Sequence, residues 1–213
     1  MNSSDNLSSQ LSHVRWIGGG SGAAKSTTAR RLADAHGAVI YDTDAAMGEH
    51  ASRCSSHACP QLAHFKRMTM DRRWVERSPK EMFQTFHWFA GEGFPFIVDD
   101  LLALPSDRLV IAEGFRLLPL LVLPLLQDKR HAIWLLPTPA FRRRAFDARG
   151  TTWEIPRKTS NAELALANIL ARDALFTDRV RDEVSSLGLH ALDVDGSQSE
   201  DVLEAVIGDL LFG

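Results

Sequence analysis

A glycine-rich loop between an apolar segment and a helix-forming segment constrains this chain more than any other feature. Residues 19–26 follow the pattern G-x-x-x-x-G-K-[ST], except that Ala24 replaces the last glycine. Residues 14–17 before the loop are typical of a short buried strand, and residues 27–36 after it are typical of a helix. In this order of strand, loop and helix, successive backbone N–H groups can form a cradle for phosphate.

The residue types of the loop indicate which atoms would contact a nucleotide. Lys25 is placed to reach the β- and γ-phosphates, and the Ser26 hydroxyl is placed to bind Mg²⁺. The positive end of the following helix adds to the attraction for anions. A plain glycine-rich turn is the alternative, but the lysine and the hydroxyls stand at the required offsets. We therefore expect nucleotide contacts from nine consecutive residues: Gly19, Gly20, Ser21, Gly22, Ala23, Ala24, Lys25, Ser26 and Thr27.

Length and composition favour one folded domain. The chain has 213 residues, of which 45% are hydrophobic, so it can bury a full core. A formal net charge of −3 gives no general attraction for nucleic acid. Residues 1–12 are polar and predict a disordered tail before a domain at 13–213. Prolines and charges interrupt the apolar stretch 109–126, so no membrane association is expected. Two cysteines and no export signal favour a reducing cytoplasm.

Apolar strand patterns alternate with helical patterns along the chain. Strands are expected at 14–17, 38–41, 109–112, 131–136 and 189–194. Helices are expected through most of 45–100, at 115–127, from 140, at 162–187 and from about 198 to 211, with a loop at 150–160. This alternation predicts an α/β fold in which helices cover both faces of a parallel sheet.

Two aspartates follow the second expected strand. Groups that contact ligands collect at the carboxyl ends of strands in open α/β sheets. Asp42 is a candidate ligand of hydrated Mg²⁺, and Asp44 is a candidate to orient a substrate hydroxyl and accept its proton. Asp44 also suits the cap of a helix that starts after it, and the two roles are compatible.

A third carboxylate ends the apolar run 109–112. Glu113 would support Mg²⁺ or its waters if that strand lies beside the loop strand. The rival acidic pair, Asp99 and Asp100, is expected to cap a helix that begins at Leu101. Arg116 would face the same cleft and bind substrate or phosphate, with a surface salt bridge as the alternative.

Four arginines follow the fourth expected strand, at positions 142, 143, 144 and 149. Arginines here would stabilise the charge on a phosphoryl group in transfer. Three consecutive helical positions fan through about 200°, so only one or two can face the nucleotide. The spacing of seven favours Arg142 and Arg149 as the catalytic pair.

Two clusters in residues 45–100 have open roles. His50, Cys54, His57 and Cys59 are types that bind zinc, but their spacing matches no common zinc pattern, so reduced thiols are expected. An aromatic group can either stack on a planar substrate or pack into the core. Its members are Phe83, Phe86, His87, Trp88, Phe89 and Phe94.

Together these motifs resemble the P-loop kinases of small molecules and nucleotides. The loop, the Tyr41–Asp44 stretch and the arginine segment look like shikimate kinase, whereas the Ile111–Gly114 strand end looks more like uridine kinase. The resemblance implies a three-layer P-loop NTPase fold, a five-stranded parallel sheet of order 2-3-1-4-5, a substrate-binding insertion at 45–100 and a lid at 140–160. It also implies ATP with Mg²⁺, and a loop at 195–197 beside the adenine.

The expected activity is transfer of a γ-phosphoryl group to a hydroxyl or phosphate of a small metabolite, nucleoside or nucleotide, in a monomer or a homodimer. Shikimate itself is not expected, because Glu113-Gly114-Phe115-Arg116 stands where shikimate kinases have a glycine triplet. The alternative is a nucleotide-binding switch or degenerate kinase without efficient transfer. Ala24 favours that alternative, because an alanine at positive φ costs roughly 1–2 kcal/mol.

Overall fold

The computed structural model describes residues 3–149 and 154–213, apart from the side chains of residues 3–5, 149 and 154. Five parallel strands form one sheet in the order β2-β3-β1-β4-β5. This is the expected sheet and the expected order. Each strand begins within one residue of its expected start, and their bounds are β1 Val14–Gly19, β2 Val39–Asp42, β3 Val110–Glu113, β4 Ala132–Pro137 and β5 His190–Val194.

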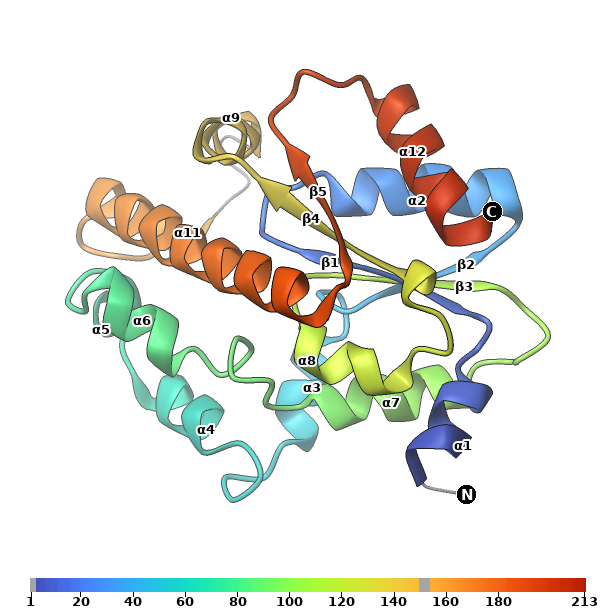
Figure 1. Ribbon diagram of the computed structural model, residues 1–213. Helices are drawn as coiled ribbons and strands as arrows, with labels where there is room; N and C mark the ends of the chain where they lie inside the picture. The colour runs from blue at the N-terminus through green and yellow to red at the C-terminus, as the bar shows by residue number, and fades with distance from the viewer. Residues whose placement is uncertain (1–2, 150–153) are drawn as a thin grey trace.

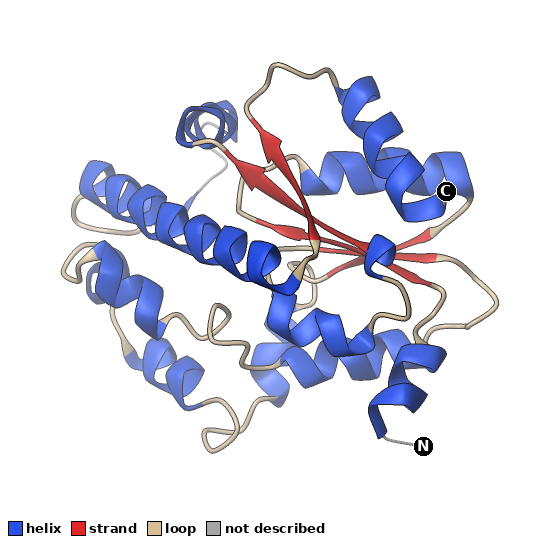
Figure 2. Ribbon diagram, viewed as in Figure 1, coloured by secondary structure: helices blue, strands red, loops and turns tan. Residues whose placement is uncertain are grey.

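Helices cover both faces of the sheet (Figures 1 and 2). One face carries α2 Lys25–His36 and α12 Glu200–Phe212, and the other carries α11 Ala162–Leu187 and the helices around it. The strands alternate between two cores, because Ile17, Ile111 and Leu135 pack towards α2 and α12. Their neighbours Trp16, Ala112 and Trp134 pack towards α11 and the insertion. The period-two pattern of each strand thus divides its side chains between the two helical layers.

The insertion after β2 is helical, as expected. It contains α3 Met47–Arg53, α4 Pro60–Arg67, α5 Met70–Trp74, α6 Pro79–Thr85 and α7 Phe94–Ala103. The expectation for the acidic pair is wrong: Asp99 and Asp100 lie inside α7, which begins after Gly93 at positive φ. Pro95 in the first turn of α7 suits a helix start, because its missing N–H would have no helical partner there.

The leucine-rich segment after β3 is a broken element rather than one helix. It forms α8 Pro119–Val122 and the 3₁₀ turn η1 Leu123–Leu125, and a second 3₁₀ turn, η2 Lys129–His131, leads into β4. Pro124 explains the break, because it lacks the N–H that continues an α-helix and its ring clashes with the preceding turn. Helix α9 Pro139–Arg149 follows β4, and the expected loop at 150–160 contains a short helix, α10 Glu154–Arg157.

The part of the expected tail that the structure describes is mostly helical. Ser3–Gln10 forms helix α1. Leu7 and Leu11 pack against the core, and Leu11 is only 1% exposed. The spacing of four puts these two leucines on one side of the segment. Serines and asparagines surround the two leucines in the sequence, and this polar composition is why the sequence predicted a disordered tail. Within residues 3–149 and 154–213, no helix has the length and apolar character that crossing a bilayer requires.

Candidate functional site

The glycine-rich loop occupies the expected junction between β1 and α2. Gly19 has φ 118°, and a Cβ added there would lie 2.1 Å from the carbonyl oxygen of Leu135. Only glycine fits this point, where the loop leaves β1 and passes against β4. Beyond it the backbone turns through Ser21 and Gly22 to the start of α2.

Ala24 keeps the backbone conformation of the glycine it replaces. Its dihedral angles are φ 61° and ψ 15°, and no other non-glycine residue in the described part of the chain has positive φ. Ala24 is also the N-cap of α2, and its carbonyl oxygen accepts a bond of 3.0 Å from the Thr28 N–H. The left-handed conformation costs an alanine roughly 1–2 kcal/mol. The fold therefore preserves the loop geometry at the expense of local strain.

Lys25 and Ser26, at the start of α2, contact the loop and the end of β3. The Lys25 side chain is 7% exposed, and its Nζ donates to the carbonyl oxygen of Gly20 at 2.8 Å. The Ser26 hydroxyl lies near enough to the carboxylate of Glu113 to lower its pKa. This contact joins the first turn of α2 to the end of β3, so the loop hydroxyl and the strand carboxylate share one site.

Sheet register brings the predicted carboxylates together. Glu113 is the register partner of Ile17 on one side and of Asp42 on the other. Burial raises the pKa of Glu113, and Asp42 and Asp44 raise it further, while the Ser26 hydroxyl and the charge of Lys25 oppose the shift. The three carboxylates are therefore close enough to interact electrostatically at the carboxyl edge of the sheet.

Asp42 shapes the turn that presents Asp44. Its Oδ1 accepts from the backbone N–H groups of Asp44 at 2.8 Å and Ala45 at 3.1 Å. The expectation that Asp44 caps the next helix is wrong, because α3 has Ala46 as its N-cap and no side-chain cap. Asp42 satisfies the turn instead, and the exposed Asp44 side chain lines the cavity described next.

A cavity of about 470 Å³ connects the loop to the insertion. One end is formed by residues 21–27 and Asp44. The other end is walled by aromatic side chains from the insertion and from the segment after β3, namely Phe65, Trp74, Phe86, Trp88, Phe89 and Phe115. Of the aromatic cluster singled out in the sequence, Phe86, His87, Trp88 and Phe89 line the cavity, whereas Phe83 and Phe94 pack outside it.

Of the arginines after β4 whose side chains the structure describes, Arg142 is the one that reaches the loop. It is 1% exposed, its Nε donates to the Ser21 carbonyl oxygen at 3.3 Å and its Nη2 hydrogen-bonds Thr177. The two residues after it point elsewhere. Arg143 pairs with Asp147, and Arg144 donates to the Asp195 carbonyl oxygen in the loop after β5. The other predicted lid residue, Arg149, ends α9, and its side chain lies outside the described atoms.

Arg116 lies behind the cavity wall, not in it. It is 2% exposed and donates to the carbonyl oxygens of Thr43 at 3.1 Å and Gly93 at 3.3 Å. Its guanidinium stacks 4.2 Å from the centre of the Trp88 ring, and burial lowers its pKa to about 10. Arg116 therefore fixes the Asp44 turn and the insertion relative to each other, which neither sequence alternative anticipated.

A scan against protein-family models and a search of curated proteins both find no match to this chain. What this chain shares with P-loop NTPases is therefore limited to the α/β fold and the strand order 2-3-1-4-5.

Among the cavity residues that the sequence did not single out are two charged ones, Arg172 and Asp173. Both lie on α11 and both are buried. Most buried positions of that helix form an apolar stripe, Ala165, Ile169, Phe176, Val180 and Val184. A charged pair in the middle of such a stripe is the signal that would have found them, because charges are seldom buried without a partner or a role.

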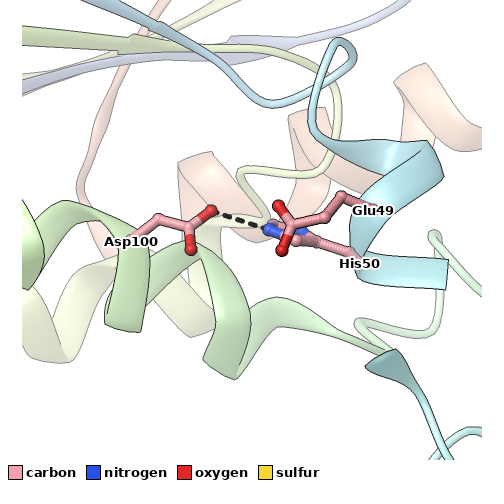
Figure 3. A group of neighbouring side chains, drawn as sticks. All are labelled: Glu49, His50 and Asp100. Atoms are coloured by element: carbon pink, nitrogen blue, oxygen red, sulfur yellow. Dashed lines mark hydrogen bonds and ion pairs between the residues drawn. The ribbon is translucent and has the colours of Figure 1, made fainter. Parts of the chain in front are cut away.

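The histidine and cysteine cluster does not form the four-residue zinc site considered for it. Cys54 and Cys59 are joined in a disulfide, in contrast to the expected reduced thiols. His50 on α3 binds Asp100 on α7 at 2.8 Å, and Glu49 lies beside them (Figure 3). Arg53 contacts both carboxylates, and Asp100 also accepts from Tyr41. This network joins α3 to α7 and β2.

Proposed function

We propose that the protein is an ATP-dependent phosphotransferase that moves the γ-phosphoryl group to a hydroxyl or phosphate of a small metabolite, nucleoside or nucleotide. The observation that carries the proposal is the single cavity that contains both Lys25 and Ser26 of the loop and Asp44 of the second strand end. A phosphate donor at the loop and an acceptor at Asp44 would then share one enclosed space, as direct transfer requires.

Charge on the donor side comes from two residues. Lys25 lies 2.8 Å from a loop carbonyl, within easy reach of a phosphate held by the same loop. Arg142 reaches the loop from the lid and contacts the Ser21 carbonyl oxygen. Both side chains are nearly buried, so their charges act on the phosphoryl oxygens with little screening by water.

The residues present also fit a magnesium ion. Ser26, Asp42 and Glu113 supply one hydroxyl and two carboxylates, which are the hard oxygen donors that Mg²⁺ prefers. Bound there, the ion would neutralise charge on the β- and γ-phosphate oxygens. Ionised Glu113 is the form suited to this role, and Lys25 favours that form.

On the acceptor side, the Asp44 carboxylate orients the hydroxyl and takes its proton. The acceptor oxygen forms the new bond to phosphorus as the bond to the bridging oxygen breaks, and ADP leaves. The exposed position of Asp44 in the cavity, and the Asp42 hydrogen bonds that fix its backbone, support this assignment.

The test is an ATP-consumption screen against nucleosides, nucleotides, sugars and hydroxylated ring compounds. The Lys25→Ala variant should lose transfer, because it removes the cation nearest the loop. Arg143→Ala is the matched control, since Arg143 lies on the same lid helix as Arg142 but pairs only with Asp147 among the described residues. Tight ATP binding with no transfer to any acceptor would instead favour the nucleotide-binding switch that Ala24 suggests.

A further inference from the structure

The far wall of the cavity is an aromatic surface with fixed geometry. Phe86 lies at its centre, with ring centres 4.8 Å from Phe89 and 5.6 Å from Phe65, both in edge-to-face contact. Phe89 in turn stacks on Phe176 of α11 at 3.9 Å. Rings locked in such contacts present a preformed apolar wall. A polyol bound against that wall would leave several hydroxyls without hydrogen-bond partners, whereas a flat ring would not.

Arg172 places one cationic donor within this aromatic wall. Its guanidinium lies 4.5 Å from the centre of the Phe86 ring and 5.1 Å from that of Trp74. Nε and Nη2 both donate to Asp173, at 2.9 and 2.6 Å. Nη1 is buried and has no hydrogen-bond partner among the residues that the structure describes. Arg172 is 6% exposed and lines the cavity, whereas Nη1 is itself covered, so a small turn of the guanidinium would offer this donor to an oxygen atom of a bound molecule.

His87 is a second polar residue in the lining of the cavity. The ring is 2% exposed, lines the cavity, and its Nδ1 likewise lacks a partner within residues 3–149 and 154–213. Burial, together with the charges of Arg116 and Arg172, lowers its pKa to about 3, so the imidazole is neutral at physiological pH. The cations around His87 make this end of the cavity favourable for an oxygen that carries negative charge.

We propose that the acceptor is a planar ring compound that carries a carbonyl or carboxylate oxygen, bound with that oxygen at Arg172 and with its hydroxyl at Asp44. This inference rests on the proposed function where it says that the bound compound accepts a phosphoryl group. The chemistry of the bound compound is inferred from the cavity alone. The cavity volume of about 470 Å³ is in the range of small-molecule sites.

Calorimetry with three probes tests the proposal without any turnover. The first is 3-(hydroxymethyl)benzoate, the second is its ring-saturated counterpart 3-(hydroxymethyl)cyclohexanecarboxylate, and the third is benzyl alcohol, which lacks the carboxylate. The benzoate should bind at least tenfold more tightly than either of the others. Uridine and the non-planar dihydrouridine form a second pair, which distinguishes a ring carbonyl from a carboxylate as the preferred oxygen. Equal affinity for planar and saturated members of both pairs would overturn the proposal.

Arg172→Lys then separates a binding role from a structural one. Lysine keeps the charge beside Asp173 but removes the guanidinium fork, so binding of the favoured planar compound should weaken at least tenfold while benzyl alcohol changes little. A merely structural arginine would weaken both equally, and that result would refute the assignment. Arg143→Lys on the exposed face of α9 is the control.

The two proposals can fail separately. If planar compounds bind as expected but receive no phosphate from ATP, the proposed function fails and the cavity assignment stands. If phosphate is transferred to sugars in preference to planar compounds, the phosphotransferase stands and the planar-acceptor inference fails.

Discussion

Asp42 and Glu113 are register partners on the adjacent parallel strands β2 and β3. The same register pairs Glu113 with Ile17, two residues before the glycine-rich loop leaves β1. Carboxylates that lie far apart in the sequence therefore end at one edge of the sheet, beside Ser26. This alignment brings the loop and the three strand-end carboxylates together at one place on the sheet.

Ala24→Gly should relieve the strain of φ 61°. We expect a gain of about 1 kcal/mol or less in the free energy of unfolding, because glycine also has more freedom in the unfolded chain. ATP binding should tighten as well, since a methyl group leaves the phosphate cradle. Denaturant unfolding and calorimetry measure the two effects.

Gly37→Ala is the matched control for that variant. Gly37 caps the other end of α2 at φ 65°, and an added Cβ there would meet no atom within 4 Å. The substitution should cost roughly 1 kcal/mol through backbone strain alone and leave ATP affinity unchanged. Unaltered stability in both variants would mean that positive φ carries no penalty in this helix.

Asp44→Asn should reduce turnover about 100-fold or more, because the amide cannot accept the proton of the acceptor. ATP affinity should remain within about twofold, since the proposed function gives Asp44 a contact with the acceptor and none with ATP. Steady-state kinetics and calorimetry provide the two measurements. Asp147→Asn, at an exposed pair on α9, is the control. A parallel loss of both quantities would reassign Asp44 to nucleotide binding.

Glu113 should contribute a distinctive dependence of stability on pH. Its folded pKa is raised above the ordinary value of 4.5, chiefly by burial. The stability that Glu113 gives to the folded state is therefore greatest below pH 4.5, and it is lost as the pH rises through the folded pKa. Glu113→Gln should remove that loss, so the variant should gain stability relative to wild type as the pH rises above 4.5, while losing Mg²⁺-dependent turnover. Exposed Glu163→Gln on α11 should change neither quantity.

His87 should make the fold sensitive to acid. Its folded pKa of about 3 lies below the ordinary value of 6.5, so stability from the neutral ring is present above pH 6.5 and falls as the pH drops towards 3. The slope due to this group is about 1.4 kcal/mol per pH unit. Urea unfolding of His87→Gln across this range should show a shallower decline than wild type. The exposed His57→Gln variant should match wild type.

Reduction of the Cys54–Cys59 bond should lower the free energy of unfolding by about 2 kcal/mol, the loop-closure value for residues five apart. The bond joins the end of α3 to the start of α4, away from the loop residues. ATP affinity should therefore be the same with and without a reductant. Cys54→Ser should reproduce the stability loss and then show no further response to the reductant.

Much of the fold could be predicted from the sequence because the patterns that indicate it are local. The strand patterns, the loop motif and the long helix α11 depend on residues close together in the sequence. The errors arose where distant contacts override local pattern. The polar segment of α1 is ordered by the docking of Leu7 and Leu11, and Asp100 takes part in a network with Tyr41 and His50 rather than a helix cap.

The sequence by itself determined the glycine-rich loop, the alternation of strands and helices, and the carboxylates at the strand ends, because each is encoded by residue type and short spacing. Only the tertiary structure decided which charged groups face the cavity. It buried Arg116 behind the wall, brought Arg142 onto the loop and set Arg172 among the aromatic rings. These outcomes depend on packing between segments tens of residues apart, and no local spacing records that packing.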